Sequence, residues 1–452
     1  MPKSSDKKLR ILWGSEQPTR PTGYGTVTRE ICKRLVERGH EVFIMGWDYN
    51  GEDFKHEEGW TMVHAGISGY GAERLSGDQS PTILEYHIMR LKPDLYFTLN
   101  DPFYIGSSVV STNKMQIPYV AYMPIDGYPI SYAWKDVLKM LHTPLWMANY
   151  GKQVFSDFID DYNSGGKAPK TLREPMLDRY RGKTGEVLLH GVDTPVFAPI
   201  SEEQKQDIKE KFRITHWKFI FSSVGRNTNR KQIPRLLQAF RNLLDEADDP
   251  DSIGLLIHCG DASDTMGMGG WDLPLTLRQM NLMDNVRFTD KGNNPLMGLS
   301  REELAMVYAV SDVHVLATGG EGFGVPSAEA MSTGIPIILP DNSTGPELTG
   351  GSFGGSRKKV VEADRGWLVK CATEICGGKW SVNMGLVDIE ALQSAMQSAI
   401  DNPDLVAEMG RNARDFAVEN LDWEIITDQA EAILRKASDK EHPLGRLASR
   451  GM

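Results

Sequence analysis

The sequence predicts an α/β protein with two domains, each built around a doubly wound parallel sheet. Three observations lead to this fold class. The chain has 452 residues, which is more than one hydrophobic core usually fills. Short apolar runs alternate with amphipathic stretches, as in successive strand–helix–strand units. The same alternation begins again near residue 199, so the architecture occurs twice along the chain.

The first half contains short apolar runs that predict strands, most of them bounded by Gly, Pro or Asp. They lie at residues 10–14, 41–45, 94–99, 118–123, 145–148 and 187–190. The first helix is expected over residues 28–37, because this stretch is amphipathic and ends before Gly39.

The second half repeats the pattern. Strands are expected at residues 218–224, 254–258, 285–288, 313–317 and 335–339, and helices at 233–244 and 304–310. A last helix is expected from about residue 424 to 436. We therefore expect an amino-terminal domain at 1–198, a carboxyl-terminal domain at 199–423, and a segment at 424–452 whose helix packs on the first domain.

Composition and charge narrow the classes of function. The chain is 40% hydrophobic and 25% charged, which is ordinary for a globular protein. The formal net charge of -11 argues against stable binding to nucleic acid, since that binding rests on Lys and Arg that neutralise phosphates. No apolar run reaches the ~18 residues of a membrane span, and the basic start lacks the apolar segment of a secretory signal.

Cysteine usage indicates the compartment. Cys32, Cys259, Cys371 and Cys376 are too few and too scattered for a disulfide scaffold or a zinc site. We expect free thiols and a cytoplasmic location.

Three Gly-rich polar segments have two interpretations each. Residues 163–183 hold six basic residues, Lys167, Lys170, Arg173, Arg179, Arg181 and Lys183. A solvated loop is the simpler interpretation, and weak peripheral contact with phospholipid or with an acceptor is the alternative. Segments 261–272 and 350–359 are solvated connections or mobile lids.

The most informative segment is Glu321-Gly-Phe-Gly-Val-Pro-Ser-Ala-Glu329. It follows an apolar strand and leads into a helical pattern that we expect from Ser327, so Glu321 lies on a loop and Glu329 on the first helical turn. Backbone N–H groups of the residues after Glu321, namely Gly322, Phe323 and Gly324, then form a ready anion site at a helix N-terminus. Glu321 can accept hydrogen bonds from sugar hydroxyls, and Glu329 can hold a ribose diol.

A second constellation is the basic loop from Gly225 to Lys231, between a strand and a helix. Gly225 permits a tight turn and close approach of a phosphate. Arg226 can grip phosphate oxygens through its planar fork, and Lys231 can add a point charge. Arg230 has no such role and is interpreted as a surface charge, as is Arg235.

Two loops of the first half complete the candidate site. Gly23 and Gly25 lie after the first strand, where open α/β sheets bind ligands, and let backbone approach a diphosphate or an acceptor. No dinucleotide-binding fingerprint fits this loop. Asp126 follows the strand at 118–123 and is either a turn or cap residue or a contact of the reacting group.

The pair Glu321 and Glu329 resembles the E-x7-E signature of retaining glycosyltransferases with the GT-B fold, above all glycosyltransferase family four (glycosyl transferases group one). Gly225, Arg226 and Lys231 are similar to a basic pattern of the same family. The resemblance implies two Rossmann-like domains facing across a cleft, with the donor bound by the second and the acceptor by the first. It implies a hexosyltransferase that uses a nucleoside diphosphate sugar and a hydroxyl acceptor, with retention and without cofactor or metal. A UDP-sugar is favoured over a GDP-sugar as donor, but the donor base and the sugar do not follow from the sequence.

The resemblance also implies roles for single residues. Glu321 would hold the donor sugar, Glu329 the ribose, and Arg226 with Lys231 the diphosphate. The loop of Gly23 and Gly25 would face the donor phosphates. Asp126 lies near the position where many relatives carry a His that contacts the transferred sugar. His190 stands where Asn is usual and is expected to serve a hinge turn.

Two other classes of function remain open. One is a sugar-nucleotide-binding protein without transfer on the same scaffold, and the other is a nucleotide-sugar epimerase or a phosphorylase. The acid and base groups of an epimerase and the pyridoxal-phosphate lysine of a phosphorylase have no evident place in the sequence. The acceptor (lipid, glycan, small molecule, protein or modified nucleobase) and the oligomeric state do not follow from the sequence.

Overall fold

The structure is a computed structural model that describes residues 7–67, 69–164, 184–260, 262–263, 269–289, 299–352, 359–377 and 382–439. Most of the basic segment 163–183, parts of the segments 261–272 and 350–359, and the tail after residue 439 lie outside the described residues. The chain divides into two compact units. The first comprises Met1–Ile125, Pro129–Gly191 and Trp423–Met452, and the second Asp126–Tyr128 and Val192–Asp422.

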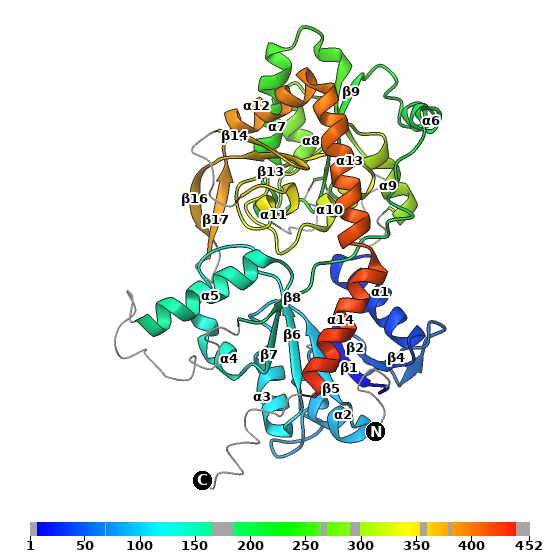
Figure 1. Cartoon of the computed structure of the whole chain (residues 1–452), viewed down its shortest axis with the longest axis vertical. Helices are drawn as coiled ribbons and strands as arrows, with labels where there is room; N and C mark the ends of the chain where they lie inside the picture. Colours follow the sequence, from blue (N-terminus) through cyan, green and yellow to red (C-terminus); the bar gives the residue numbers. More distant parts are fainter. Residues whose placement is uncertain are drawn as a thin grey trace. The chain divides into compact units, whose positions relative to one another are not determined.

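The first unit is built on an eight-stranded sheet with the order β3-β4-β2-β1-β5-β6-β7-β8 (Figure 1). All neighbouring strands are parallel except β3, which runs antiparallel to β4. The strands are β1 Arg10–Ser15, β2 Glu41–Gly46, β3 Phe54–Lys55, β4 Thr61–Val63, β5 Leu95–Leu99, β6 Tyr119–Met123, β7 Thr143–Trp146 and β8 Glu186–Val187. The helices are α1 Gly23–Glu37, α2 Ile83–Leu91, α3 Gly106–Met115, α4 Lys135–Met140, α5 Asn149–Ser164 and α14 Trp423–Ser438, with a 3-10 turn, η2, at Tyr132–Trp134.

The second unit has a seven-stranded sheet with the order β11-β10-β9-β12-β13-β15-β14 and a separate antiparallel pair, β16 and β17. Only the edge strand β14 is antiparallel to its neighbour in the larger sheet. The strands are β9 Phe219–Val224, β10 Ile253–His258, β11 Val286–Phe288, β12 Val313–Val315, β13 Ile337–Pro340, β14 Val360–Ala363, β15 Gly366–Val369, β16 Cys371–Gly377 and β17 Val382–Val387. The helices are α6 Glu202–Phe212, α7 Ile233–Glu246, α8 Leu273–Gln279, α9 Arg301–Ala309, α10 Val325–Ser332, α11 Gly345–Thr349, α12 Ile389–Asp401 and α13 Pro403–Asn420, with 3-10 turns η5 Asn229–Lys231 and η6 Pro250–Ser252.

The prediction of two doubly wound parallel sheets is confirmed. In each unit the first strand lies inside the sheet, the next strands extend the sheet to one side, and the chain then crosses to the other side. The order therefore reverses between β1 and β5 in the first unit and between β9 and β12 in the second. Ligands of open α/β sheets bind beside such switch points, at the carboxyl ends of the strands.

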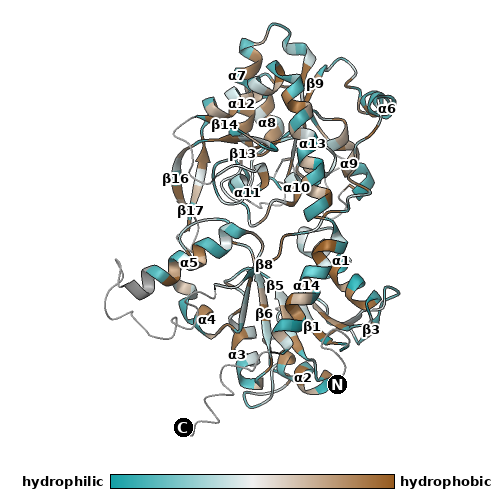
Figure 2. Ribbon diagram, in the orientation of Figure 1, coloured by the Kyte–Doolittle hydropathy of each residue, from teal (hydrophilic) through white to brown (hydrophobic). Residues whose placement is uncertain are grey.

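Both cores follow from apolar periodicity. Leu236, Leu237, Phe240 and Leu243 on one face of α7 are buried against the sheet of the second unit. Figure 2 shows apolar and polar residues mixed along α1 and α14, as expected for helices with one face on a sheet and the other in water. None of the described helices combines the length and the apolar character needed to cross a membrane.

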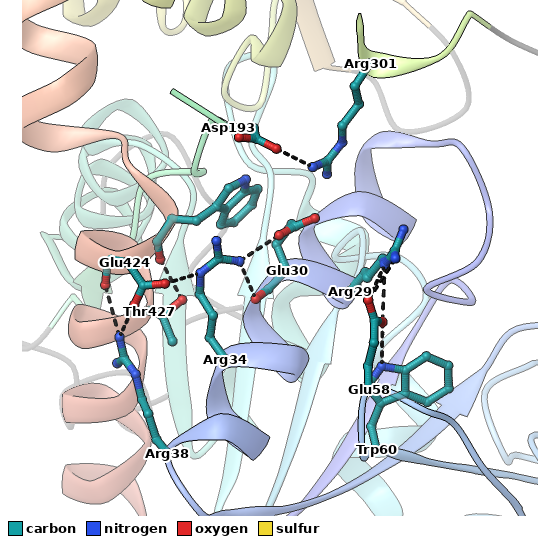
Figure 3. A network of polar contacts seen from close by, with 11 residues as sticks. Arg29, Glu30, Arg34, Arg38, Glu58, Trp60, Asp193, Arg301, Glu424 and Thr427 are labelled. Carbon is teal, nitrogen blue, oxygen red and sulfur yellow. Dashed lines mark hydrogen bonds and ion pairs between the residues drawn. The ribbon is translucent and has the colours of Figure 1, made fainter. Parts of the chain in front are cut away.

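The final helix, α14, packs on α1 within the first unit. Arg34 of α1 pairs with Glu424 at 2.7 Å and with Glu30 at 2.6 Å, and Arg38 pairs with Glu424 at 3.1 Å (Figure 3). The same figure shows Arg301 paired with Asp193 in the second unit, at 3.0 Å. Ion pairs thus reinforce the apolar contact that holds α14.

Two predicted elements begin earlier than the sequence indicated. Helix α1 starts at Gly23 rather than residue 28, because the Thr22 side chain accepts a hydrogen bond from the Gly25 N–H and caps the helix. Gly23 and Gly25 therefore lie in the first helical turn and not in a loop. Helix α10 starts at Val325 rather than Ser327, since Pro326 is tolerated in a first turn.

The cysteines and His190 have simple surroundings. All four cysteines are free, which confirms the expectation of thiols. His190 was expected to serve a hinge turn, and its ring is buried in the first unit, with Nδ1 2.7 Å from the Tyr122 hydroxyl oxygen. Burial lowers the pKa of His190 to about 3, so this imidazole is neutral.

Candidate functional site

The topology of the second unit brings two distant loops together. The loop after β9 carries Gly225 to Lys231, and the loop after β12 carries Glu321, and the two strands are neighbours at the switch point. The Gly319 N–H donates to the Arg230 carbonyl at 2.7 Å. This hydrogen bond joins the backbones of the two loops, so it does not depend on their side chains.

The centre of the site is an ion pair between Lys231 and Glu321. Lys231 Nζ donates to Glu321 Oε1 at 2.7 Å, and the two side chains are 9% and 11% exposed. Burial alone would raise the pKa of Glu321, but the nearby Arg230 and Lys231 outweigh it and lower this pKa to about 2. Burial lowers the pKa of Lys231, against the opposing effect of Glu321. The carboxylate is therefore ionised at every physiological pH.

Arg230 joins this pair, which corrects its interpretation as a surface charge. Its Nη1 lies 3.1 Å from Glu321 Oε2, and the same nitrogen donates to the Gly320 carbonyl. Its Nε lies 3.7 Å from Asp126 Oδ2, and residues 126–128 belong to the second unit by their contacts. The structure thus brings Asp126 near Glu321 through one guanidinium.

Gly225 makes room for the lysine. A Cβ added at Gly225 would lie 3.2 Å from Lys231 Cε and 3.3 Å from Nζ, so the side chain of Lys231 folds across the glycine backbone. Arg226 follows on the same loop with an exposed side chain. The loop therefore presents one nearly buried cation bound to a carboxylate and one exposed cation.

Glu329 sits in a different environment. It lies in the second turn of α10, and not the first turn as predicted, because the helix begins at Val325. Its Oε2 accepts a hydrogen bond from the Tyr308 hydroxyl at 2.9 Å. Burial outweighs this bond and the nearby Arg301 and raises the pKa of Glu329 to about 7. Two glutamates of one motif thus have pKa values on opposite sides of the ordinary range.

The N-terminus of α10 carries the Gly-rich turn. Gly324 adopts a φ of 102°, in the left-handed region, and the helix has no side-chain cap. Pro326 has no N–H and the Ser327 N–H donates to the Gly324 carbonyl at 3.0 Å, so the N–H groups of Gly324 and Val325 are the donors that this turn offers a ligand. The backbone of Glu321 is also fixed, since its N–H donates to Ser343 Oγ at 2.9 Å. Gly322 and Phe323 lie between these two fixed points.

The structure groups most of the predicted site residues and separates two of them. Gly225, Arg226, Lys231, Asp126, Glu321 and the turn from Gly322 to Gly324 share the second unit with Glu329, whereas Gly23 and Gly25 belong to the first unit. Sequence reasoning missed Arg230 and Tyr308. Arg230 had a weak signal, its position next to Lys231, while nothing near Tyr308 in the sequence marked it. No group of three or more His, Cys, Asp or Glu side chains suited to a metal ion is found among the residues that the structure describes.

Part of the second unit matches a known family. Residues 204–370 match the family of glycosyl transferases group 1, a range that contains the basic loop, Glu321 and Glu329. The chain is 29% identical over 140 residues to the MMP alpha-(1->4)-mannosyltransferase of Mycolicibacterium hassiacum, covering 31% of this chain and 28% of that protein. It is 24% identical over 252 residues to the D-inositol 3-phosphate glycosyltransferase of Corynebacterium diphtheriae, covering 56% of this chain and 50% of that protein. The matches thus span half or less of these curated relatives.

Solved structures show the fold. A glycosyltransferase from Rickettsia africae superimposes with a TM-score of 0.67 at 16% identity, over 96% of this chain and 100% of that one. HepE of Anabaena in complex with UDP and glucose gives a TM-score of 0.64 at 14% identity, over 95% of this chain and 100% of that one. These likenesses confirm the GT-B class of the fold.

Proposed function

We propose that this chain, a member of the glycosyl transferases group 1 family, moves a hexosyl group from a nucleoside diphosphate sugar to a hydroxyl acceptor with retention. The observation that carries the proposal is the buried pair of Lys231 and Glu321 at the switch point of the second unit. The pair places an ionised carboxylate and a cation side by side, where a sugar and its diphosphate would each find a partner.

Glu321 would bind the donor sugar through its hydroxyls. Its carboxylate stays ionised because Arg230 and Lys231 hold its pKa at about 2, and charged acceptors make the stronger hydrogen bonds. Arg230 and Ser343 fix the carboxylate and its backbone from two sides. A preorganised acceptor of this kind costs little reorganisation during the reaction.

Lys231 and Arg226 would neutralise the leaving diphosphate. An ammonium carries three N–H donors, and the bond from Lys231 to Glu321 uses one of them. Arg226 adds an exposed planar fork on the same loop. We propose that these cations and the N–H groups at the start of α10 take the place that a metal ion has in other transferases.

Glu329 would hold the ribose of the donor. The ribose hydroxyls donate to an ionised carboxylate, so binding favours loss of the proton that burial holds on Glu329 up to a pKa of about 7. Donor binding would therefore be linked to proton release near neutral pH. Tyr308, which donates to Oε2, orients the carboxylate.

The transfer itself would proceed by attack on the face that the leaving group departs from. The bond between the anomeric carbon and the phosphate oxygen breaks, the acceptor oxygen bonds to that carbon, and the acceptor proton passes to the leaving phosphate. Glu321 is bound by Lys231 and Arg230, and this route needs no second carboxylate as nucleophile. We propose a UDP-sugar as donor, supported by the likeness to HepE, whose structure contains UDP and glucose.

A thermal-shift and hydrolysis panel tests the proposal. UDP-, GDP- and ADP-sugars are offered to the purified chain, with and without chelator, beside the variant K231M. A ligand that binds the native state raises the melting temperature, so we expect a shift with a UDP-sugar that chelator leaves intact and K231M reduces. The absence of a shift with every donor, in a folded sample, would favour a protein without transferase activity.

A further inference from the structure

The first unit carries a feature that the proposed function does not use. The tripeptide Gly-Tyr-Gly occurs at residues 23–25 and again at 69–71. Both tyrosines make edge contacts with Trp47, with ring centroids 6.0 Å from Tyr24 to Trp47 and 5.6 Å from Trp47 to Tyr70. Tyr104 stacks on Tyr70 with centroids 5.1 Å apart and an interplanar angle of 17°. These four rings, Tyr24, Trp47, Tyr70 and Tyr104, form one continuous aromatic row.

The row is assembled at the switch point of the first sheet. Tyr24 lies in the first turn of α1 after β1, Trp47 directly follows β2, and Tyr104 follows β5. These strands are adjacent, in the order β2-β1-β5, so the rings share the carboxyl edge of a parallel sheet. This is where doubly wound sheets bind their ligands.

The backbone holds the rings in place. Gly69 and Gly71 have φ values of 74° and 62°. A Cβ at Gly69 would lie 2.9 Å from the Trp47 Cα, and one at Gly71 would lie 2.9 Å from the Leu84 N. Both glycines are therefore needed for the loop that lays Tyr70 against Trp47. The row is preorganised, which reduces the cost of ordering side chains on binding.

The row is accessible from solvent. Tyr104 is 45% exposed, and Tyr24, Trp47 and Tyr70 are each partly exposed. Large aromatic side chains in a monomeric unit are usually covered, since they carry much apolar surface. A row of four that stays open is suited to stacking against a flat apolar face of a ligand.

The polar groups around the row are mainly acidic. Burial, and then Tyr104, Asp101, Asp48 and Glu16, raise the pKa of Tyr70 to about 12. The Tyr24 hydroxyl lies 3.4 Å from Asp101 Oδ1, and Arg20 pairs with Asp48 at 3.3 Å. The described contacts around the row thus place three carboxylates against one guanidinium.

We propose that the aromatic row binds the acceptor, and that this acceptor is an uncharged saccharide. The inference rests on the proposed function and names the substrate class of its second substrate. Sugar rings present apolar C–H faces that pack on aromatic rings and hydroxyls that donate to carboxylates. Asp101, Asp48 and Glu16 supply such acceptors, and their negative charge disfavours a phosphorylated acceptor by like-charge repulsion.

The proposed acceptor differs in charge from the acceptor of one relative. A D-inositol 3-phosphate glycosyltransferase acts on a phosphate-bearing acceptor by its name. An acceptor site for phosphate needs cations in fixed positions, whereas the described contacts of the row supply Arg20, which already pairs with Asp48. The same fold would thus serve acceptors of different charge through the residues at one sheet edge.

Acceptor panels and a matched pair of tyrosine variants test the proposal. Uncharged disaccharides (maltose, cellobiose and mannobiose) and phosphorylated acceptors (glucose 6-phosphate and inositol 3-phosphate) are offered to the full chain. Binding without donor is followed by saturation-transfer NMR, and transfer is followed by release of nucleoside diphosphate. We expect binding of at least one uncharged disaccharide and turnover of none of the phosphorylated acceptors.

The variant Y104A removes the most exposed ring and is expected to raise the acceptor KM about tenfold while leaving the donor KM unchanged. The variant Y104F keeps the ring, so its acceptor KM should stay well below that of Y104A. Tyr86 on α2 is 39% exposed and packs against Arg90, so Y86A is the matched control without effect. Y70A is a second variant of the row in case Y104A fails to fold.

The outcomes separate the two proposals. Preference for a phosphorylated acceptor, binding of none of the uncharged disaccharides, or equal behaviour of Y104A and Y86A would overturn the saccharide site. In each of these cases, donor binding and hydrolysis by the parent would still stand for the transferase proposal. A parent protein that binds no donor would instead contradict the proposed function.

Discussion

The two switch points of this chain have the same topology and opposite chemistry. In the second unit, the loops after β9 and β12 bring Arg230, Lys231 and Glu321 together in a partly buried ionic cluster. In the first unit, the loops after β1, β2 and β5 assemble the aromatic row of Tyr24, Trp47, Tyr70 and Tyr104. The fold thus fixes where ligands bind, and the residue types at the strand ends decide which ligand binds.

The two switch points also differ in what holds their side chains in position before a ligand binds. In the ionic cluster, each charge is held in position by an opposite charge in partly buried surroundings. The aromatic row is held in position by the backbone conformation of one loop, which requires Gly69 and Gly71. Changes in the ionic cluster should therefore affect both stability and activity, whereas truncation of a ring should affect binding alone.

The largest effect is expected for E321Q. Glu321 and Lys231 are nearly buried, and removal of one partner from a buried pair costs about 3 kcal/mol in the free energy of unfolding. Loss of a charged hydrogen bond to the donor should lower kcat/KM about a hundredfold. Urea unfolding and steady-state kinetics measure the two effects.

The double variant K231M/E321Q is the control for this prediction. Because it removes both charges of the pair, it should be more stable than E321Q, and its activity should remain low. Stability losses that simply add, with no coupling between the two positions, would contradict the buried pair as the centre of the site.

The second prediction concerns pH and Glu329. With a pKa of about 7 in the folded state, Glu329 is protonated below neutral pH and cannot accept both ribose hydroxyls. Donor affinity should fall about tenfold per pH unit below 7 and should be far less sensitive to pH in E329Q. Calorimetric titration from about 1.5 pH units below neutrality to about 1.5 units above it measures this dependence.

Stability supplies an independent check on the same residue. The pKa of Glu329 is raised from its ordinary value of 4.5 to about 7, so between these values the native state holds a proton that the unfolded chain has released. The parent should therefore lose stability relative to E329Q as pH rises from about 4.5 to 7, with no further change above. A constant difference between the two proteins over this range would show that the carboxyl titrates normally.

The third and smaller effect is expected for G225A. The added Cβ would lie 3.2 Å from Lys231 Cε, and the bond to Glu321 prevents the lysine from moving away freely. We expect donor affinity to fall roughly threefold with an unchanged fold. Gly106 begins α3, and a Cβ there would make an ordinary contact of 3.6 Å with Val137, so G106A is the control. Equal donor affinities of G225A and the parent would mean that the Lys231 side chain can move aside without weakening donor binding.

Strands and helices could be predicted from the sequence where their buried positions form an apolar pattern. Strands such as β1, β6 and β9 are runs of buried apolar residues, and all three were expected. The pair β16 and β17 was missed, since β16 is largely exposed and Thr373 and Glu374 interrupt its apolar residues, which leaves no apolar run. Strand β3 was missed because it spans two exposed residues, too few to show a period.

The candidate site was predictable as a set of residue types and not as a set of contacts. Lys231 and Glu321 are separated by 90 positions, and the sheet order, not the local sequence, makes them neighbours. Arg230 was interpreted as a surface charge because nothing in its local sequence distinguishes it from one. Tyr308 lies on α9 and reaches Glu329 through packing of α9 on α10, a contact that no spacing rule contains. The opposite pKa shifts of the two glutamates follow from these contacts.

The smallest effect is expected where ion pairs lie in water. Glu424 of α14 bridges Arg34 of α1 and Arg38, the residue that follows this helix, as Figure 3 shows, but its side chain is 63% exposed. Exposed pairs contribute about 0.5 kcal/mol, and salt screens them. The variant E424A should therefore lower the free energy of unfolding by about that amount at low salt and by less near 1 M salt.

The variant D428A, which removes another exposed partner of Arg38 on the same helix, should behave in the same way. A loss of several kcal/mol in E424A that persists in high salt would show that α14 depends on this carboxylate. The expected result assigns the attachment of α14 to its buried apolar face, which includes Ile426, Ala430 and Leu434. Pairing of charges would then matter in this chain only where burial accompanies it, as it does for Lys231 and Glu321.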